Sequence, residues 1–505
     1  MSAGNLLIHG RRIPSDQLTP VLAYRRLVAP DDRLAPSFLL ESVDQSGQVG
    51  RHSMIGSRPA VQVIAHGQSV EVLHANGQTE RMESLNPLQV PRSISGAWKP
   101  VHSGCVPDAF HGGWVGFLGF DAVRWIEPKA LPFSASPRDD RNLPDMHLGL
   151  YQRVAVFDHA LRIVDCVAAE SLEAHASEQA ARKAIDLAID QTIQLMLKPS
   201  ASLPTGEIVL DVHADPADMS PGSMTPLQFK QAVEKAKQAI AAGDAFQIVL
   251  SQRLERKTDI DPFEIYRALR IVNPSPYQVY LQARDCILVA SSPEIACRVR
   301  GRTVTNRPLA GTRPRGSTPE QDAVLEKDLR ADPKERAEHS MLVDLGRNDL
   351  GRVCEPGSIS VERCMDVERY SHVMHLSSTI TGTLRKGMDA WDALQATLPV
   401  GTVSGAPKIR AIQLIDQLEP LRRGPYAGAL GVAGFSGDMD MAIALRTMVI
   451  PTGASAVAPW QVHLQAGAGI VMDSDPAAEF NETMHKAAAL GRAIDLAEQT
   501  FAVGG

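Results

Sequence analysis

Two short stretches of the sequence place pairs of glutamates at the starts of predicted helices. Each stretch begins with Asp-Pro, in which the aspartate can cap free backbone N–H groups and the proline suits the first helical position. Glutamates at positions i and i+3 then lie on one helix face, with Cβ atoms roughly 5–6 Å apart. The residues are Asp332, Pro333, Glu335 and Glu338 in the first stretch, and Asp475, Pro476, Glu479 and Glu482 in the second.

These carboxylates need a counter-charge if they face the protein interior. Glu338 is in register with Met341, Leu342 and Leu345, the apolar stripe of its predicted helix. Buried carboxylates are paired, protonated or bound to a cation. Four of them with few basic partners predict a divalent cation, and Mg²⁺ fits because it binds one or two protein carboxylates with substrate and water oxygens. The alternative is surface charge favoured by the helix dipole.

Further residues with chemical potential lie in loops, turns and strands of the same half of the chain. Each alone is a weak signal, because glycine turns usually serve packing and a lone strand histidine is usually structural. No P-loop or strand-linked G-x-G-x-x-G is present, so nucleotide binding is not predicted. The candidates are the loop 308–316 with Gly311 and Thr312, the strand residue His375, the turn 401–408 with Thr402, the pair Tyr426 and Arg446, and a small-residue turn at 465–470 with Gly467, Ala468 and Gly469.

The surrounding sequence predicts the elements that must position these groups. An amphipathic helix opens at Thr225-Pro226 and stops at Gly243, and a strand follows at 245–253. Strands then alternate with helices without a βαβ rhythm, which favours an α+β fold with mainly antiparallel sheets and helices outside them. The later strands are expected at 287–290, 372–381, 442–450 and 461–466. The predicted units are an N-terminal lobe (1–170), a helix and linker (171–224) and a catalytic region (225–500).

Composition excludes several classes of function. The 505 residues carry a net charge of −7 and are 44% hydrophobic, so nothing points to nucleic acid or an anionic membrane as a partner. No stretch resembles a signal peptide or approaches 18 uninterrupted apolar residues. Six cysteines form no C-x-x-C pair, which argues against zinc ribbons and disulfide frameworks. We therefore expect a cytoplasmic protein.

In combination and order, the motifs resemble the chorismate-utilising enzymes, and among them the large subunits of anthranilate synthases. The resemblance covers about residues 225 to 495. It extends to the N-terminal lobe through Leu39-Leu40-Glu41-Ser42 and through residues 50–56 and 112–121. It implies the chorismate-binding enzyme fold and a lyase that converts chorismate and ammonia, with Mg²⁺, to anthranilate and pyruvate, the first step of tryptophan biosynthesis.

The resemblance also implies a role for each candidate residue. Chorismate is a dianion, so one cationic clamp for each carboxylate suits it. The implied roles are metal binding by Glu338 and Glu482, with Glu335 and Glu479 around them; binding of the ring carboxylate by the metal, Lys486 and the amides of Gly467, Ala468 and Gly469; binding of the enolpyruvyl carboxylate by Tyr426 and Arg446; pocket lining by Gly311 and Thr312; substrate orientation by Thr402; and acid–base chemistry by His375.

Two positions separate relatives within the family. Isochorismate and salicylate synthases have a water-activating lysine where this chain has Gln247, and a neutral glutamine suits ammonia, which is itself a nucleophile. Aminodeoxychorismate synthases have a nucleophilic lysine where this chain has Ala310, so no covalent adduct can form there. Direct attack by ammonia at C2 fits better. The nearest rival is an aminodeoxyisochorismate synthase, which stops before pyruvate leaves.

A regulatory site and a partner are implied as well. Ser42, with Pro276, Tyr277 and Gln278 of the segment 273–278, resembles the family's tryptophan feedback site, although the usual sequence has Met at the position of Gln278. No cysteine lies in a G-x-C-x-G turn, so glutamine-dependent activity needs a separate amidotransferase subunit, in a hetero-oligomer built on two copies of each chain. A rival of another class is a catalytically dead protein that senses tryptophan.

Overall fold

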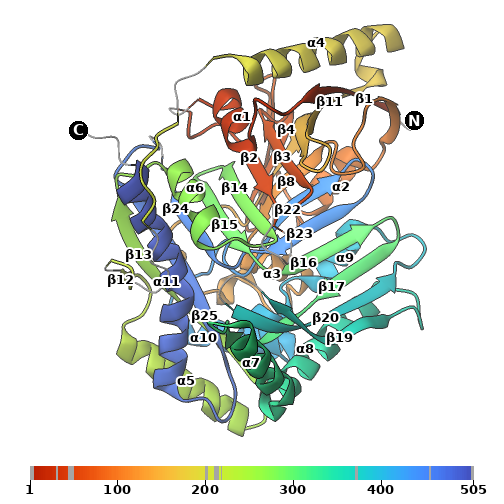
Figure 1. Ribbon diagram of the computed structural model, residues 1–505. Helices are drawn as coiled ribbons and strands as arrows, with labels where there is room; N and C mark the ends of the chain where they lie inside the picture. Colours follow the sequence, from red (N-terminus) through yellow and green to blue (C-terminus); the bar gives the residue numbers. More distant parts are fainter. Residues whose placement is uncertain are drawn as a thin grey trace.

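Two large β-sheets pack face to face at the centre of the protein, with helices outside them (Figure 1). The computed structural model describes residues 5–29, 32–43, 50–199, 203–209, 215–217, 219–369, 373–453 and 456–501. One sheet has 13 strands and the other has 12. Among the named strands, all pairings are antiparallel apart from β1 with β7. The predicted α+β fold with mainly antiparallel sheets is confirmed.

The elements are bounded as follows. The first sheet runs through β12 (Ser220–Pro221), β13 (Gln247–Thr258), β25 (Trp460–Ile470), β24 (Thr447–Pro451), β15 (Cys286–Ser292), β14 (Tyr277–Ala283), β2 (Ser37–Glu41), β3 (His52–Ser57), β10 (Arg153–Asp158), β11 (Ile163–Ser171), β1 (Asn5–Pro14) and β7 (Lys99–Gly104), with β21 (Gly405–Ala406) on β13. The second runs through β18 (Leu309–Pro314), β20 (Val373–Thr383), β17 (Thr303–Arg307), β16 (Ile295–Arg300), β23 (Met439–Ile443), β22 (Ala429–Gly434), β8 (Gly113–Leu118), β9 (Met146–Tyr151), β4 (Val61–His66), β5 (Ser69–His74) and β6 (Thr79–Glu83), with β19 (Ser360–Arg369) on β20. The helices are α1 (Pro20–Leu27), α2 (Gln89–Ser95), α3 (Val123–Ile126), α4 (Glu178–Leu197), α5 (Pro226–Ala241), α6 (Pro262–Val272), α7 (Pro319–Ala331), α8 (Pro333–Gly351), α9 (Ala390–Thr397), α10 (Lys408–Leu418) and α11 (Pro476–Phe501).

The first sheet is buried on both faces. Along its strands, alternate residues belong to two different hydrophobic clusters, as expected from the two-residue period of a strand. In β15, for example, Leu288 and Ala290 point into the core between the sheets, whereas Ile287 and Val289 join a core shared with α1, α4, α6 and α11. Such strands read as continuous apolar runs, which explains why they show little alternation in the sequence.

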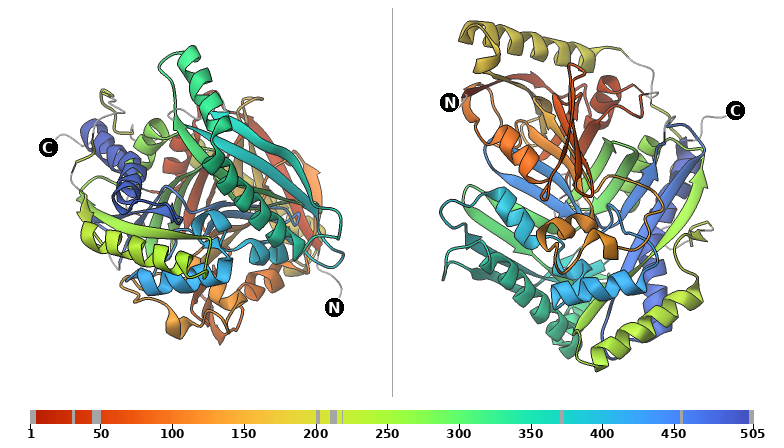
Figure 2. Two further views of the ribbon diagram at one scale, coloured as in Figure 1. Left: turned by 90° about the horizontal axis from the view of Figure 1, so that it is seen from below. Right: turned by 180° about the vertical axis from the view of Figure 1, so that it is seen from behind.

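Strands from both ends of the chain share each sheet. In the first sheet β2 pairs with β14, so Glu41 lies opposite Gln278. In the second sheet β8 pairs with β22, so Gly116 lies opposite Gly431. Helix α4 follows the N-terminal strands, and the predicted linker 198–224 includes residues 200–202, 210–214 and 218, which lie outside the described residues. Figure 2 shows α5 and α10 side by side at the end of the molecule farthest from α4.

Several predicted strands have different bounds in the structure. The strand expected at 245–253 is β13, which starts at Gln247 because Phe246 is exposed and its N–H binds the carbonyl of Ala406. The strand expected at 372–381 is β20, with residue 372 outside the described residues. Among the helices of the described segments, none is long and apolar enough to cross a membrane.

Candidate active site

The two acidic helix starts fold as their sequence predicts. Asp332 caps α8 by accepting hydrogen bonds from the N–H groups of Lys334 and Glu335, at 2.9 and 3.2 Å. Asp475 caps α11 in the same way, at 3.0 Å from the amide of Ala477 and 2.8 Å from that of Ala478. Each cap satisfies amides that the first helical turn leaves unpaired, and so fixes where the glutamates of that turn lie.

The glutamates of α8 and α11 lie close enough for the charge of one to affect the pKa of another. Burial raises the pKa of Glu338, and the charges of Glu335 and Glu482 raise it further. Burial also raises the pKa of Glu479, with an added contribution from Glu482. Glu482 itself is about half exposed and lies 2.7 Å from the ammonium of Lys486. The sequence therefore identified carboxylates that the fold brings together although Glu338 and Glu482 are 144 positions apart in the chain.

The carboxylates do not form a closed metal cage. Among the described residues, no three His, Cys, Asp or Glu side chains are arranged as a metal-binding group. The chemistry of the site nevertheless fits Mg²⁺, which needs only one or two protein carboxylates. A cation between Glu338 and Glu482 would relieve the repulsion that raises the pKa of Glu338.

Gln247 contacts Glu338 of this acidic region, and His375 contacts Gly311, which lies beside Glu335. The amide nitrogen of Gln247 donates to Glu338 Oε1 at 2.8 Å, and its Oε1 is buried without a hydrogen-bond partner among the described residues. His375, on β20, donates from Nδ1 to the carbonyl of Gly311 at 3.2 Å and has Thr312 Oγ1 at 3.0 Å. Gly311 forms a bulge there with φ of +78°, which suits glycine.

Burial, together with the positive charges of Arg446 and Lys486, lowers the pKa of His375 to about 4. The imidazole is therefore neutral at physiological pH. Because Nδ1 carries the proton that binds Gly311, Nε2 carries the lone pair and can accept a proton.

The predicted turn at 465–470 is wrong, because these residues form the end of β25. Gly467 and Gly469 pair with Ser251 and Val249 of β13. Glycine is needed at both positions because other side chains lie close to the backbone. A Cβ on Gly469 would lie 2.6 Å from Gln247 Nε2, and one on Gly467 would lie 3.0 Å from the Tyr426 hydroxyl.

One edge of this strand is open for a ligand. The pairing of β25 with β24 ends at Leu464, whereas its pairing with β13 continues to Ile470. Lys486 Nζ reaches the same segment and donates to the carbonyl of Gly467 at 2.9 Å. Alternate backbone groups of residues 467–469 therefore face the site and not a neighbouring strand of the described sheet.

Arg446 lies where the chain crosses from one sheet to the other. The single strand predicted at 442–450 is wrong: β23 ends at Ile443 in the second sheet, and β24 starts at Thr447 in the first. Arg446 adopts φ of +46° at the crossing, and its Nη1 donates to Asn273 Oδ1 at 3.4 Å. Tyr426 is buried nearby, and burial raises its pKa, so the phenol keeps its proton.

Glu294 is a functional candidate that the sequence analysis missed. Thr402 Oγ1 donates to Glu294 Oε1 at 2.9 Å, across 108 positions of chain. Burial raises the pKa of Glu294 to about 8, so this carboxyl group is mainly protonated at neutral pH. The one signal in the sequence is a glutamate two residues after the apolar strand 286–292, at the end of a Ser-Ser-Pro-Glu run.

Two of the segments that hold the predicted regulatory residues lie side by side. Because β2 pairs with β14, Ser42 follows the residue opposite Gln278. Three buried polar atoms near this contact have no hydrogen-bond partner among the described residues: Asn273 Nδ2, Ser275 Oγ and Gln278 Nε2. Tyr277 instead binds Asp440, with 2.6 Å between its hydroxyl and Oδ1.

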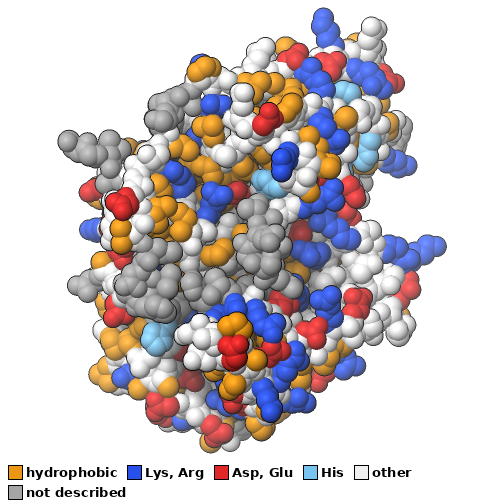
Figure 3. Space-filling model, viewed as in Figure 1, with side chains coloured by type: hydrophobic (Ala, Val, Ile, Leu, Met, Phe, Trp, Pro, Cys, Tyr) orange, Lys and Arg blue, Asp and Glu red, His pale blue; other side chains and the backbone are white. Residues whose placement is uncertain are grey.

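Positive side chains gather across the middle of the face seen in Figure 3, between the upper strands and the lower layer that contains α7 and β20. A family model described as chorismate binding enzyme matches residues 35–492 of the chain. The chain belongs to the chorismate-binding enzyme family.

Relatives within the chorismate-binding enzymes match nearly the whole chain. It is 53% identical over 515 residues to anthranilate synthase alpha subunit 1, chloroplastic, of Oryza sativa subsp. indica, covering 98% of this chain and 89% of that protein. It is 46% identical over 492 residues to anthranilate synthase component 1 of Streptomyces coelicolor, covering 96% of this chain and 88% of that one.

Solved structures of chorismate-binding enzymes share the fold. Anthranilate synthase component I from Streptococcus pneumoniae matches with a TM-score of 0.74 and 35% identity, covering 95% of this chain and 99% of that chain. The menaquinone-specific isochorismate synthase of Escherichia coli has a TM-score of 0.68 at 20% identity, covering 96% and 94%, and so shows a common fold alone.

Proposed function

We propose that this chain is the large subunit of an anthranilate synthase, a lyase that converts chorismate and ammonia to anthranilate and pyruvate. The observation that carries the proposal is the similarity, over nearly the full length, to relatives that bear this name. The residues that distinguish reactions within the family agree with it. Gln247 offers ammonia a neutral amide, and Ala310 offers no amine for a covalent adduct.

Glu338 and Glu482 hold Mg²⁺ in this proposal, with Glu335 and Glu479 around them. The support is the burial of Glu338 and Glu479, which raises the pKa of each, with a further contribution from the negative charges of neighbouring carboxylates. Bound there, Mg²⁺ would supply positive charge for the ring carboxylate of chorismate. Lys486 lies beside Glu482 and adds a second positive charge to the same side of the site.

The two carboxylates of chorismate have separate clamps in this proposal. The ring carboxylate lies along the open backbone edge of Gly467, Ala468 and Gly469, where Lys486 reaches. The enolpyruvyl carboxylate binds the guanidinium of Arg446 and the hydroxyl of Tyr426. Arginine suits this role because its planar fork can bind both carboxylate oxygens. Gly311 and Thr312 line the pocket beside His375.

In this proposal a neutral amide orients ammonia, and two groups whose pKa values favour the uncharged form, Glu294 and His375, transfer protons. The unpartnered Oε1 of Gln247 can accept a hydrogen bond from ammonia and orient its lone pair toward C2. The protonated Glu294, which Thr402 contacts, can donate to the departing C4 hydroxyl. The product of this first stage is aminodeoxyisochorismate. Neutral His375 can then accept the ring proton as pyruvate leaves.

A partner subunit supplies the ammonia. The sequence has no G-x-C-x-G nucleophile turn, and none of its six cysteines is placed for amide hydrolysis. Glutamine would therefore be hydrolysed by a separate amidotransferase, in a heterotetramer with two copies of each chain. Cytoplasmic location remains our prediction from the cysteine spacing.

L-tryptophan is the proposed feedback inhibitor, bound between Ser42 and the segment Pro276, Tyr277 and Gln278. The unpartnered buried atoms of Asn273, Ser275 and Gln278 support a polar ligand there, because buried polar groups are normally hydrogen-bonded. An amino acid could satisfy them with its ammonium and carboxylate.

One assay tests the reaction. Purified chain is incubated with chorismate, Mg²⁺ and ammonium, and anthranilate fluorescence and pyruvate are followed together. Equal amounts of both products support the proposal. Accumulation of an amino intermediate without pyruvate would instead identify an aminodeoxyisochorismate synthase. Tryptophan binding without turnover at any ammonium concentration would identify a catalytically dead sensor.

A further inference from the structure

A buried ion pair contacts the backbone of segments that carry proposed site residues. Arg423 and Glu419 have side chains only 2% and 3% exposed. The guanidinium donates from Nε to Glu419 Oε2 at 2.9 Å and from Nη2 to Oε1 at 2.6 Å. Neither residue is among the groups that the sequence motifs identified.

The same guanidinium binds two backbone carbonyls that belong to different parts of the site. Nη1 donates to Val403 at 2.7 Å, and Nη2 donates to Val249 at 2.7 Å. Val403 follows Thr402 in the chain, and Val249 lies two residues after Gln247 on β13. One side chain therefore joins the turn that carries Thr402 to the strand that carries Gln247.

Glu419 extends the network to the glycine strand. Its Oε1 accepts hydrogen bonds from the N–H of Ser251 at 2.8 Å and from the hydroxyl at 3.1 Å. Ser251 lies opposite Gly467 and receives a hydrogen bond from Gln465 Nε2 at 2.9 Å. The guanidinium carbon of Arg423 also lies 5.8 Å from the ring centroid of Tyr426.

Stability alone does not account for this arrangement. Replacing a buried ion pair with apolar side chains is often neutral or stabilising, because both charges lose their hydration on burial. The geometry of arginine accounts for it better. Its planar fork of five N–H donors can serve a carboxylate and two carbonyls in fixed directions, whereas the single ammonium of lysine cannot.

We propose that Arg423, held by Glu419, is a positioning residue that fixes the Thr402 turn against the Gln247 strand for the reaction. The inference rests on the proposed anthranilate synthase activity. Because Arg423 would fix the relative placement of catalytic groups, its loss should lower kcat more than it weakens the binding of chorismate.

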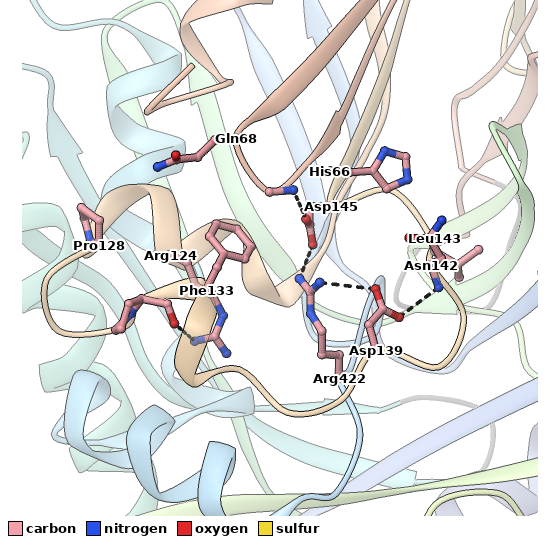
Figure 4. Close-up of a pocket in the computed structure, with 12 residues that line it drawn as sticks. His66, Gln68, Arg124, Pro128, Phe133, Asp139, Asn142, Leu143, Asp145 and Arg422 are labelled. Atoms are coloured by element: carbon pink, nitrogen blue, oxygen red, sulfur yellow. Dashed lines mark hydrogen bonds and ion pairs between the residues drawn. The ribbon is translucent and has the colours of Figure 1, made fainter. Parts of the chain in front are cut away.

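The neighbouring Arg422 is a matched control, because it points away from the site. It binds Asp139 and Asp145 (Figure 4). These three residues line the cavity drawn in Figure 4, which has a volume of about 470 Å³. Its lining includes none of the predicted site residues. Arg422 also donates to Asp121 at 3.0 Å, so it is ion-paired like Arg423. Within the described part of the chain its guanidinium donates to no carbonyl of the Thr402 turn or of β13.

The first test is Arg423→Lys, assayed with ammonium and normalised to folded protein. Displacement of Thr402 and Gln247 should lower kcat about 10- to 100-fold. The KM for chorismate should change much less than kcat, because Arg446 and Lys486 keep their contacts. Arg422→Lys should leave kcat unchanged. An unchanged kcat in Arg423→Lys would overturn the inference.

The second test distinguishes a positioning role from a role in stability. It is sufficient by itself if Arg423→Lys does not fold. The double variant Arg423→Met with Glu419→Leu replaces the ion pair by apolar side chains. We expect its melting temperature to approach that of the unmodified protein while kcat stays low. Recovery of kcat together with stability would refute a positioning role. If the unmodified chain made no anthranilate, the proposed function would fail instead.

Discussion

Single residues in the site are held in uncharged forms by burial. The pKa of Glu294 is raised to about 8 and that of His375 is lowered to about 4. At neutral pH the first is mainly a carboxylic acid and the second a neutral imidazole. Ionisable groups whose pKa values are pushed in opposite directions are suited to proton transfer.

Glu294→Gln should stabilise the protein and remove activity. Between pH 5 and 8 the unfolded chain releases the proton of Glu294 while the folded chain keeps it, so native stability falls as pH rises. The glutamine variant has no carboxyl group at this position, so its stability does not fall with pH for this reason. Its free energy of unfolding at pH 8 should exceed that of the unmodified chain by on the order of 3 kcal/mol, shrinking to less than about 1 kcal/mol at pH 5.

Urea unfolding at the two pH values measures this difference, and anthranilate fluorescence measures kcat, which should fall about 10²- to 10⁴-fold. Glu83→Gln, at an exposed position of β6, is the control and should change neither quantity. Equal stability of the Glu294 variant and the unmodified chain at pH 8 would mean that Glu294 is ionised in the native state.

His375→Ala should slow the reaction about 10²- to 10⁴-fold without weakening Mg²⁺ binding. Because the pKa of His375 is about 4, the kcat/KM of the unmodified chain should decline on acidification below about pH 5, and not near the ordinary histidine value of about 6.5. Steady-state kinetics over a range of pH values measures this acidic decline in kcat/KM. A rate that survives the substitution would remove His375 from the mechanism.

The elements were predictable wherever the signal was local. Asp332 and Asp475 cap helices as their Asp-Pro sequence predicts, and the capping box of α5 uses the predicted Thr225. Gly467 and Gly469 were misread as a turn, because the sequence cannot show that Tyr426 and Gln247 press against their backbone. A glycine required by close packing and one required by a turn look the same in a single sequence.

Contacts between distant segments could not be predicted from the residues alone. Glu294 meets Thr402 and Arg423 meets Val249 across 108 and 174 positions of chain. Nothing local marks either contact. The placement of Arg446 between two sheets was missed for the same reason, since residues 442–450 are apolar enough to read as one strand. The roles of the metal, substrate and inhibitor residues remain predictions.

The pairing of β2 with β14 leads to a prediction at the scale of elements. Ser42→Arg should relieve tryptophan inhibition while leaving catalysis intact, because a long charged side chain would enter the space beside Gln278. The inhibition constant for tryptophan should rise at least about tenfold, equivalent to 1.4 kcal/mol. Ser69→Arg, at an exposed strand end, should have no effect. Inhibition retained in Ser42→Arg would exclude the proposed site.

At the scale of the whole molecule, the two ends of the chain complete the same sheets. A fragment of residues 225–501 would expose the edges of β14 and β22, where β2 and β8 pair, and would lose the N-terminal side chains that fill part of the core between the sheets. Open, apolar strand edges promote association. We expect this fragment to aggregate on expression, as judged by size-exclusion chromatography. A monomeric, active fragment would contradict this account of the fold.

The central claim is that carboxylates of α8 and α11 hold the Mg²⁺ that anchors chorismate. Calorimetric titration of Mg²⁺ in the presence of chorismate, without ammonia, tests it most directly. The control is Asp344→Asn, since Asp344 is an exposed carboxylate of α8. We predict that Glu338→Gln and Glu482→Gln each weaken Mg²⁺ binding at least about tenfold, or 1.4 kcal/mol, and that Asp344→Asn does not. Unchanged Mg²⁺ affinity in both glutamine variants would contradict the claim.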